Sequence, residues 1–190
     1  MTHSIFESNL IRLRGMEPED WLFFHQFDRD TDSARMSYHI PFPGSQLAAR
    51  QWAEAEALKK PILDEYRFAI ENNNGELVGT LNTHSCNLQN GTFSYGLAIA
   101  PEFRRRGYAT ESILLVLHYY FYELRYQKAN ATVYSCNPES IALHQHLGFT
   151  LEGQLRRMEF NDGQFHDHLL FGMTIEEFEE KYSARLRQTL

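Results

Sequence analysis

The sequence predicts an α+β fold, in which a central mixed, mostly antiparallel sheet contains one βαβ crossover and is flanked by helices. Residues 93–100 alternate large apolar side chains with small ones, which is the period of a half-buried strand. Apolar residues then recur at helical spacing from Thr110 to Leu124, and residues 128–134 alternate again. These three observations predict two parallel strands joined by a right-handed crossover.

Antiparallel strands are expected on both sides of this crossover. Turns rich in asparagine and glycine at residues 72–75 and 161–163 favour two hairpins, formed by strands 66–71 and 76–84 and by strands 151–160 and 164–173. A further strand is predicted at residues 10–14. The turn Asn90-Gly91 leads into the strand of the crossover.

Four further helices are expected around the sheet. The acidic run Glu17-Pro18-Glu19-Asp20 is typical of a helix start, and a polar helix should close the chain over residues 175–187. Asn137 should cap a helix that has Pro138 at its first position. Ser45 should cap a helix that reaches about Lys60 and presents an apolar stripe of Leu47, Trp52, Ala55 and Leu58. Residues 29–44 are predicted as a long connection, and such connections are usually functional or disordered.

Length and composition favour one compact domain over residues 1–190, since 43% of the residues are hydrophobic. The first ten residues lack the pattern of a signal peptide, and no apolar run approaches the ~20 residues of a membrane span. We therefore expect a cytoplasmic protein. Cys86 and Cys136 have no metal-ligand partner at suitable spacing, and we interpret them as ordinary buried thiols.

The net charge of −7 indicates which partners the chain should avoid. An acidic protein does not attract nucleic-acid phosphates, so we expect no nucleic-acid partner. The charge is compatible with a cationic amine as partner, although solubility explains it equally well. His166 and His168 share one strand face, but two imidazoles without a third ligand make a weak metal site, and no metal is expected.

The turn between strand 93–100 and the following helix has the composition of an anion site. A helix N-terminus offers unpaired N–H groups and the positive end of the helix dipole, so a phosphate group is stabilised there. Gly107 and Ala109 add no bulk, and the arginine run at 104–106 adds positive charge. We predict that a pyrophosphate group binds at this turn.

The turn resembles the cofactor loop of the GNAT superfamily of acetyl-CoA-dependent N-acetyltransferases. Arg104-x-x-Gly107-x-Ala109 matches the family pattern (Gln/Arg)-x-x-Gly-x-(Gly/Ala), and residues 137–149 resemble its Asn-x-x-(Ala/Ser)…Leu-Gly-Phe helix. The resemblance extends across most of the chain and implies the GNAT fold and acetyl-CoA as cofactor. It implies a cofactor site made of Leu97, Ala98, Ile99, Arg104, Arg105, Arg106, Gly107, Tyr108, Ala109, Thr110 and Asn137.

The same resemblance implies the chemistry, which is direct attack of a primary amine on the thioester in a ternary complex. Many family members carry a tyrosine as leaving-group acid where this chain has His144, and Ser140 lies one helical turn earlier. We expect these two residues to be catalytic, and the sequence does not decide which of them is the acid. A strand N–H near Ile99 would stabilise the developing oxyanion.

The general base stays unassigned, because Thr132 stands where some members carry a glutamate. His84, Tyr95 and Glu102 are candidates by location, and water is another. The resemblance also makes residues 29–44 part of the acceptor wall. An equally weighted alternative is a packed surface loop whose aromatic side chains fill gaps.

The acceptor is expected to be a small-molecule amine or a peptide N-terminus. Residues 152–167 resemble the Rim-type branch, which acetylates N-termini of ribosomal proteins, so that activity is one alternative. Another is a non-catalytic acyl-CoA-binding sensory module, because the usual tyrosine and glutamate are missing. No membrane contact is expected, and the oligomeric state, monomer or homodimer, stays open.

Overall fold

The computed structural model describes residues 4–37 and 40–189. In this part of the chain no helix is both long and apolar enough to cross a bilayer. The strands are β1 Ile11–Arg14, β2 Arg67–Asn72, β3 Leu77–Asn87, β4 Thr92–Ile99, β5 Lys128–Tyr134, β6 Thr150–Asn161 and β7 Gln164–Thr174. The helices are α1 Trp21–Phe27, α2 Thr31–Ser37, α3 Gln46–Ala57, α4 Tyr108–His118, α5 Pro138–Leu147 and α6 Ile175–Thr189.

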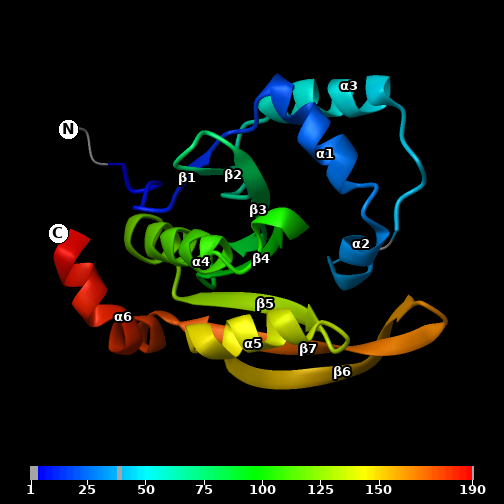
Figure 1. Ribbon diagram of the computed structural model, residues 1–190. Coiled ribbons are helices and arrows are strands. Elements are labelled where there is room, and N and C mark those ends of the chain that lie inside the picture. Colours follow the sequence, from blue (N-terminus) through cyan, green and yellow to red (C-terminus); the bar gives the residue numbers. More distant parts are fainter. Residues whose placement is uncertain (1–3, 38–39, 190) are drawn as a thin grey trace.

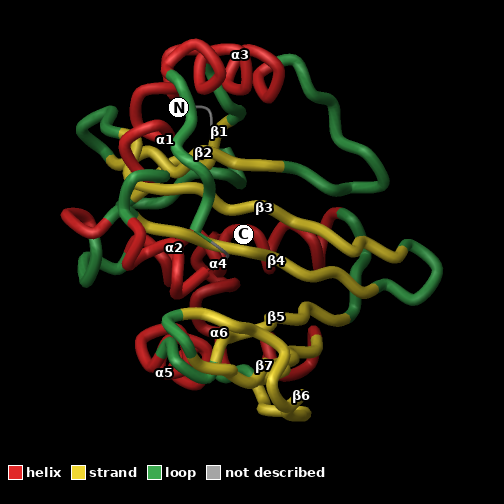
Figure 2. Tube along the Cα trace, turned by 90° about the vertical axis from the view of Figure 1, so that its right-hand side faces the viewer, coloured by secondary structure: helices red, strands yellow, loops and turns green. Residues whose placement is uncertain are grey.

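The strands form one mixed sheet in the order β1-β2-β3-β4-β5-β7-β6. All neighbouring pairs are antiparallel except β4 and β5, which are parallel and joined through α4. This confirms the predicted fold class and crossover. Figure 2 shows the strands stacked in this order, with β4 and β5 diverging towards one end.

The two faces of the sheet carry different helices. Phe93 of β4 stacks on Tyr120, at 4.2 Å between ring centroids, and Tyr95 lies beside His144 of α5. The helices α4 and α5 therefore share one face, and both lie in front of strands in Figure 1. The opposite face packs Ala69 of β2 against Met16, Phe24 of α1 and Trp52 of α3. The main apolar core lies between the sheet and α4.

Helix α2 corrects the sequence interpretation, since residues 29–44 were expected to be a connection without regular structure. The helix is held mainly by polar contacts. Its Arg35 and Met36 carbonyls accept hydrogen bonds from Asn161, at 3.1 Å, and from Asn137, at 2.9 Å. Ser33 also accepts a hydrogen bond from Arg104. These donors lie on three distant segments of the chain, so the helix forms where they meet.

The apolar stripe predicted for α3 is wrong. Ser45 caps this helix as expected and accepts the N–H of Ala48 at 3.1 Å. However, Ala53 is the buried residue of the helix, and Trp52 is half-buried beside it. Leu47 and Leu58 are 66% and 84% exposed. The contact between Trp52 and Phe24 of α1, whose ring centroids are 4.9 Å apart, sets which face of α3 points towards the protein.

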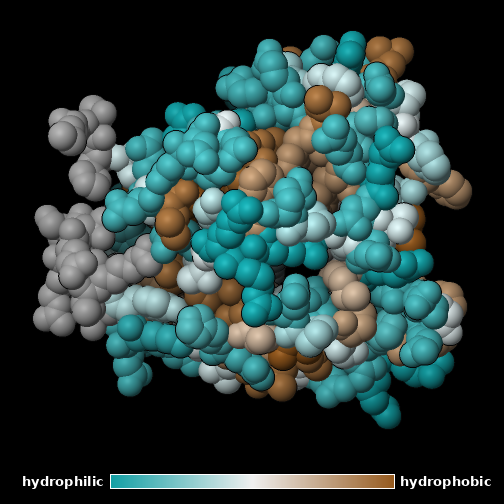
Figure 3. Space-filling model, in the orientation of Figure 1, coloured by the Kyte–Doolittle hydropathy of each residue, from teal (hydrophilic) through white to brown (hydrophobic). Residues whose placement is uncertain are grey.

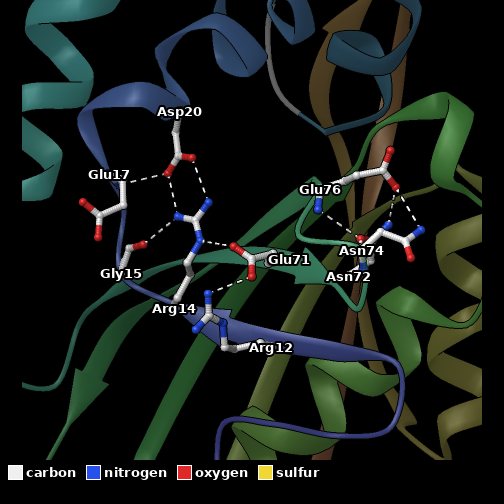
Figure 4. Close-up of polar contacts among 9 residues, drawn as sticks. All are labelled: Arg12, Arg14, Gly15, Glu17, Asp20, Glu71, Asn72, Asn74 and Glu76. Atoms are coloured by element: carbon white, nitrogen blue, oxygen red, sulfur yellow. Dashed lines mark hydrogen bonds and ion pairs between the residues drawn. The ribbon is translucent and has the colours of Figure 1, made fainter.

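An ion cluster fixes the entry into α1. Arg14 donates to both carboxylate oxygens of Asp20 at 2.8 Å and to Glu71 at 2.7 Å (Figure 4). Arg12 donates to the other oxygen of Glu71 at 2.7 Å. Burial works to raise the pKa of Glu71, but the hydrogen bonds from Arg14 and Arg12 hold it below its ordinary value. The cluster links β1, β2 and the first turn of the helical segment.

We expect Arg14→Met to lower the free energy of unfolding by about 3 kcal/mol, because Asp20 and Glu71 would stay in place without their guanidinium partner. Asp20 is only 7% exposed. Arg12→Met is the matched control, since the Arg12 side chain is 50% exposed and its loss should cost about 1 kcal/mol or less. Urea unfolding of both variants measures the difference. Equal losses would contradict a stabilising role for the Arg14 cluster.

Candidate active site

The site is a cleft where β4 and β5 separate. Their pairing covers Thr92 to Ser94 and Lys128 to Asn130, and the remaining residues of both strands have no partner across this gap. Aromatic rings occupy the space behind the gap, since Tyr95 lies 6.0 Å from Phe149 and 5.9 Å from His144, measured between ring centroids. His144 of α5 and Phe149, which follows this helix, thus hold the two strands apart.

The cleft has a volume of about 1550 Å³, and its walls come from both faces of the sheet. Thr110 of α4 and Ser140 of α5 line it from one face, while Trp52 of α3 and Phe24 of α1 line it from the other. The cleft therefore passes through the gap between the strands. A hollow is visible near the centre of the face in Figure 3, with apolar surface beside it.

The structure brings nearly all of the predicted site residues to this cleft. Its lining includes Leu97, Ala98, Ile99, Arg104, Arg105, Gly107, Tyr108, Ala109, Thr110, Asn137, Ser140 and His144. Arg106 is the exception in the predicted set. A second cavity of about 340 Å³ lies between β1, β2 and the segment 119–124, and none of the predicted site residues lines it.

The turn before α4 has the backbone that an anion site requires. Arg105 and Gly107 both have positive φ, 63° and 85°, which turns the chain sharply into the helix. Gly107 is the N-cap and provides no capping side chain, so the first N–H groups of α4 are left for other acceptors. A Cβ on Gly107 would meet only Leu10, at 3.5 Å. The glycine is required by its backbone conformation rather than by crowding.

The three arginines of this turn have different partners. Arg104 donates to the Ile99 carbonyl at 3.1 Å and to Ser33 of α2. Arg106 donates to the Glu102 carbonyl at 2.9 Å, and its guanidinium lies 5.5 Å from the Phe103 ring centroid. Arg105 lies 3.8 Å from Glu139 of α5, with both side chains largely exposed. The Arg105 side chain is 86% exposed, so its guanidinium is accessible to a ligand.

Asn137 connects α5 to α2. Its side-chain carbonyl accepts the N–H of Ser140 at 3.0 Å, which confirms the predicted N-cap, and its amide donates to Met36. This side chain thus lines the cleft while both of its polar ends have protein partners. The contact also places α2 near the end of β5.

His144 is buried among aromatic rings, and its two nitrogens differ. Nδ1 lies 2.7 Å from the Ser140 carbonyl, which can only accept, so Nδ1 carries the hydrogen. In the neutral ring Nε2 is then an acceptor, and it is buried without a hydrogen-bond partner among the described residues. Burial lowers the pKa of His144, although the hydrogen bond to Ser140 opposes the shift. At neutral pH this side chain is a proton acceptor.

The residues considered as a base occupy different places. Tyr95 lines the cleft, and its hydroxyl is also buried without a partner in the described part of the chain. Burial raises the pKa of Tyr95, so the hydroxyl keeps its proton and is a donor. His84 lines the cleft from β3 and is exposed, whereas Glu102 lies outside the lining. Thr132 of β5 lines the cleft as well.

The segment 29–44 contributes to the wall through Arg29, Met36 and residues 41–44, while Tyr38 and His39 lie outside the described residues. Sequence reasoning missed most of the opposite wall. Phe24 and Phe27 of α1, and Thr80 and Asn82 of β3, line the cleft. The polar residues Thr80, Asn82 and His84 alternate with the buried Leu81 and Thr83, and this pattern could have indicated that one face of β3 is polar. Within the described residues, no group of three or more His, Cys, Asp or Glu side chains could hold a metal ion.

Comparisons with known proteins agree with this geometry. A family model described as the Acetyltransferase (GNAT) domain matches residues 11–150. The SPbeta prophage-derived uncharacterized N-acetyltransferase YokL of Bacillus subtilis (strain 168) is 45% identical over 169 residues, which cover 89% of this chain and 92% of that protein. Spermidine N(1)-acetyltransferase of Escherichia coli (strain K12) is 29% identical over 158 residues, 82% of this chain and 81% of that protein.

A solved structure gives the same result for the fold. The crystal structure of spermidine N-acetyltransferase from Vibrio cholerae in complex with CoA and spermine has a TM-score of 0.76 to this chain. The match covers 90% of this chain and 99% of that one, at 23% sequence identity. At this identity the likeness concerns the fold.

Proposed function

Because the chain belongs to the GNAT acetyltransferase family and is an acetyl-CoA-dependent N-acetyltransferase, we propose that it acetylates a primary amine by direct attack in a ternary complex. The amine belongs to a small molecule or to a peptide N-terminus. The observation that carries the proposal is the buried, unpartnered Nε2 of His144 in the wall of a cleft that passes through the sheet. Such a cleft lets the two substrates meet from opposite faces.

The residues of the cleft fit acetyl-CoA, which supplies the acetyl group as an activated thioester. The edge of β4 from Tyr95 to Ile99 is not covered by β5, so its backbone groups are available to the amides of an extended pantetheine arm. The first turn of α4 and Gly107 offer N–H groups to the pyrophosphate. Arg105 adds an accessible cation at the same end of the cleft.

His144 moves the proton in this proposal. An alkyl ammonium group has a pKa of about 10 and must first lose one proton, to water, before its nitrogen can attack. The attached nitrogen then loses a second proton to become the amide, whereas the departing thiolate, comparable to cysteine at about 8.5, must gain one. The neutral imidazole accepts at Nε2 the proton that leaves the amine, and it returns this proton to the sulfur. Nδ1 stays hydrogen-bonded to Ser140, which keeps the ring in the accepting tautomer.

Ser140 supports His144 and contacts the sulfur end of the site. Its hydroxyl lies 3.4 Å from Nδ1 of His144 and it lines the cleft. We expect Ser140→Ala to lower kcat about fivefold, while the KM for acetyl-CoA stays unchanged, because the N–H that Asn137 caps is retained. Steady-state kinetics at saturating amine measures this. A wild-type kcat would leave Ser140 as a first-turn helix residue without a part in proton transfer.

The proposal is tested by measuring free CoA thiol released from acetyl-CoA over a panel of amines, amino acids and N-terminal peptides. We expect release that depends on one class of amine, together with a product whose mass increases by one acetyl group. Binding of acetyl-CoA, followed separately by calorimetry, is the control for a competent site. Tight acetyl-CoA binding with no release for any amine would contradict the proposal.

A further inference from the structure

One end of the cleft lies away from the predicted pyrophosphate turn and faces α1 and α3. Its floor is the face of the sheet that carries Thr80 and Asn82 of β3 and Gly96 of β4. An acceptor that enters from this side reaches the gap beside β4 from the face opposite α4. We call this part of the cleft, where an acceptor would bind, the acceptor end.

The walls of the acceptor end are aromatic. Phe24 and Phe27 of α1 line it, and Trp52 of α3 packs edge-on against Phe24. Phe42 stands between Pro41 and Pro43 in the loop before α3, and its side chain is 97% exposed. A large apolar ring left in solvent at the rim of a cleft does not fill a gap in the protein, which was one interpretation of this segment. It is suited to cover an apolar ligand.

The charges of the acceptor end do not suit a polycation. Among the described residues, the carboxylates that line the whole cleft are Asp28 and Glu139, and Glu139 lies beside Arg105 at the cofactor end. The lining also includes Arg29, which follows Asp28 in the chain, and Arg67, which donates to Glu56 at 3.2 Å. The net charge of −7 is therefore located mostly outside the cleft. With so few carboxylates in the lining, several ammonium groups would lose hydration without a counter-charge.

We propose that the preferred acceptor carries one primary amine on an aromatic or bulky apolar body, and that polyamines are poor acceptors. This inference rests on the proposed function and narrows its substrate class. It separates the chain from the relatives whose names specify spermidine. The ring of the acceptor would lie against Phe42 and Trp52, and its amine would point towards the gap at β4.

The test compares three amines at saturating acetyl-CoA: 2-phenylethylamine, butylamine, which has one amine and no ring, and spermidine. We expect kcat/KM for 2-phenylethylamine to exceed both others at least tenfold. In Phe42→Ala the KM for 2-phenylethylamine should rise about tenfold, and the KM for butylamine should stay within twofold. Leu58→Ala is the matched control, because Leu58 is 84% exposed on α3 and lies outside the cleft lining.

Three results would overturn the inference and leave the proposed function standing. One is a preference for spermidine over 2-phenylethylamine. Another is an equal change in KM for both monoamines in Phe42→Ala. Because Phe42 is almost fully exposed, its replacement creates no cavity and should not unfold the protein. Release of no CoA with these three amines, while a member of the wider amine and peptide panel is acetylated, would overturn this inference alone. No release over the whole panel, while acetyl-CoA binds, would overturn the proposed function and this inference with it.

Discussion

Gly107→Asp is expected to abolish CoA binding, with a loss of affinity of at least 100-fold. The substitution places a carboxylate at the N-terminus of α4, where the proposed site receives the pyrophosphate, so like charges meet. It also puts a side chain on a residue with φ of 85°, which resists the turn that directs the N–H groups into the cleft. Calorimetric titration of CoA into the variant measures the loss.

Gly75→Asp is the matched control for this variant. Gly75 has φ of 78°, and a Cβ there would meet nothing within 4 Å, so the control adds the same charge at similar backbone strain. It lies in the turn between β2 and β3 and outside the cleft lining. We expect this variant to bind CoA as the wild type does. If Gly107→Asp bound CoA equally well, the assignment of the pyrophosphate turn would be wrong.

The parts of the fold that the sequence predicts are those set by local pattern. The alternation at residues 128–134 gave the bounds of β5, and Asn137 followed by Pro138 gave the start of α5. Such signals depend on side-chain period and on capping, which act within a few residues. The turn around Gly107 was predictable for the same reason, since a glycine was needed at positive φ.

The parts that escaped prediction depend on distant contacts. Helix α2 has seven residues and little apolar period, and its partners Arg104, Asn137 and Asn161 are remote in sequence. The directions of the three arginines were equally hidden, because they follow from the backbone turn at Arg105. The helix after Thr110 was extended to Leu124, whereas α4 ends at His118 and continues as a π-helical turn, Tyr119–Glu123.

The interpretation of His144 shows what structure adds to a motif. The sequence offered it as a leaving-group acid, by analogy with a tyrosine. The short contact from Nδ1 to the Ser140 carbonyl, together with burial, makes the resting ring a neutral acceptor. The proposed role therefore begins with proton uptake, and the ring can act as an acid only after that step. This order of events has a measurable consequence in the pH dependence of the reaction.

His144→Phe is expected to lower kcat about 100-fold and to leave CoA affinity unchanged. Phenylalanine keeps an aromatic ring among Tyr95, Phe149 and Phe171, so the packing that holds the strands apart is retained. His118→Phe is the control, because His118 ends α4 and lies outside the cleft lining. A kcat within twofold of the wild type in His144→Phe would make His144 a core residue of the aromatic cluster.

The pH dependence separates a catalytic role of His144 from a structural one. The active ring is neutral and burial lowers its pKa, so wild-type kcat/KM should fall only below about pH 6.5, the ordinary value for histidine. This acid limb should disappear in His144→Phe.

The free energy of unfolding of the wild type should also fall as the pH is lowered, since the unfolded chain binds a proton at His144 more readily than the folded one. Neutral His144 contributes to the free energy of unfolding above about pH 6.5, and this contribution is lost as the pH falls through the lowered pKa of the folded state. The free energy of unfolding of His144→Phe, measured with urea, should therefore rise relative to that of the wild type as the pH is lowered from 7.5 to 5.5. A purely structural histidine would show this stability change without an acid limb in kcat/KM, whereas the proposed proton acceptor requires both.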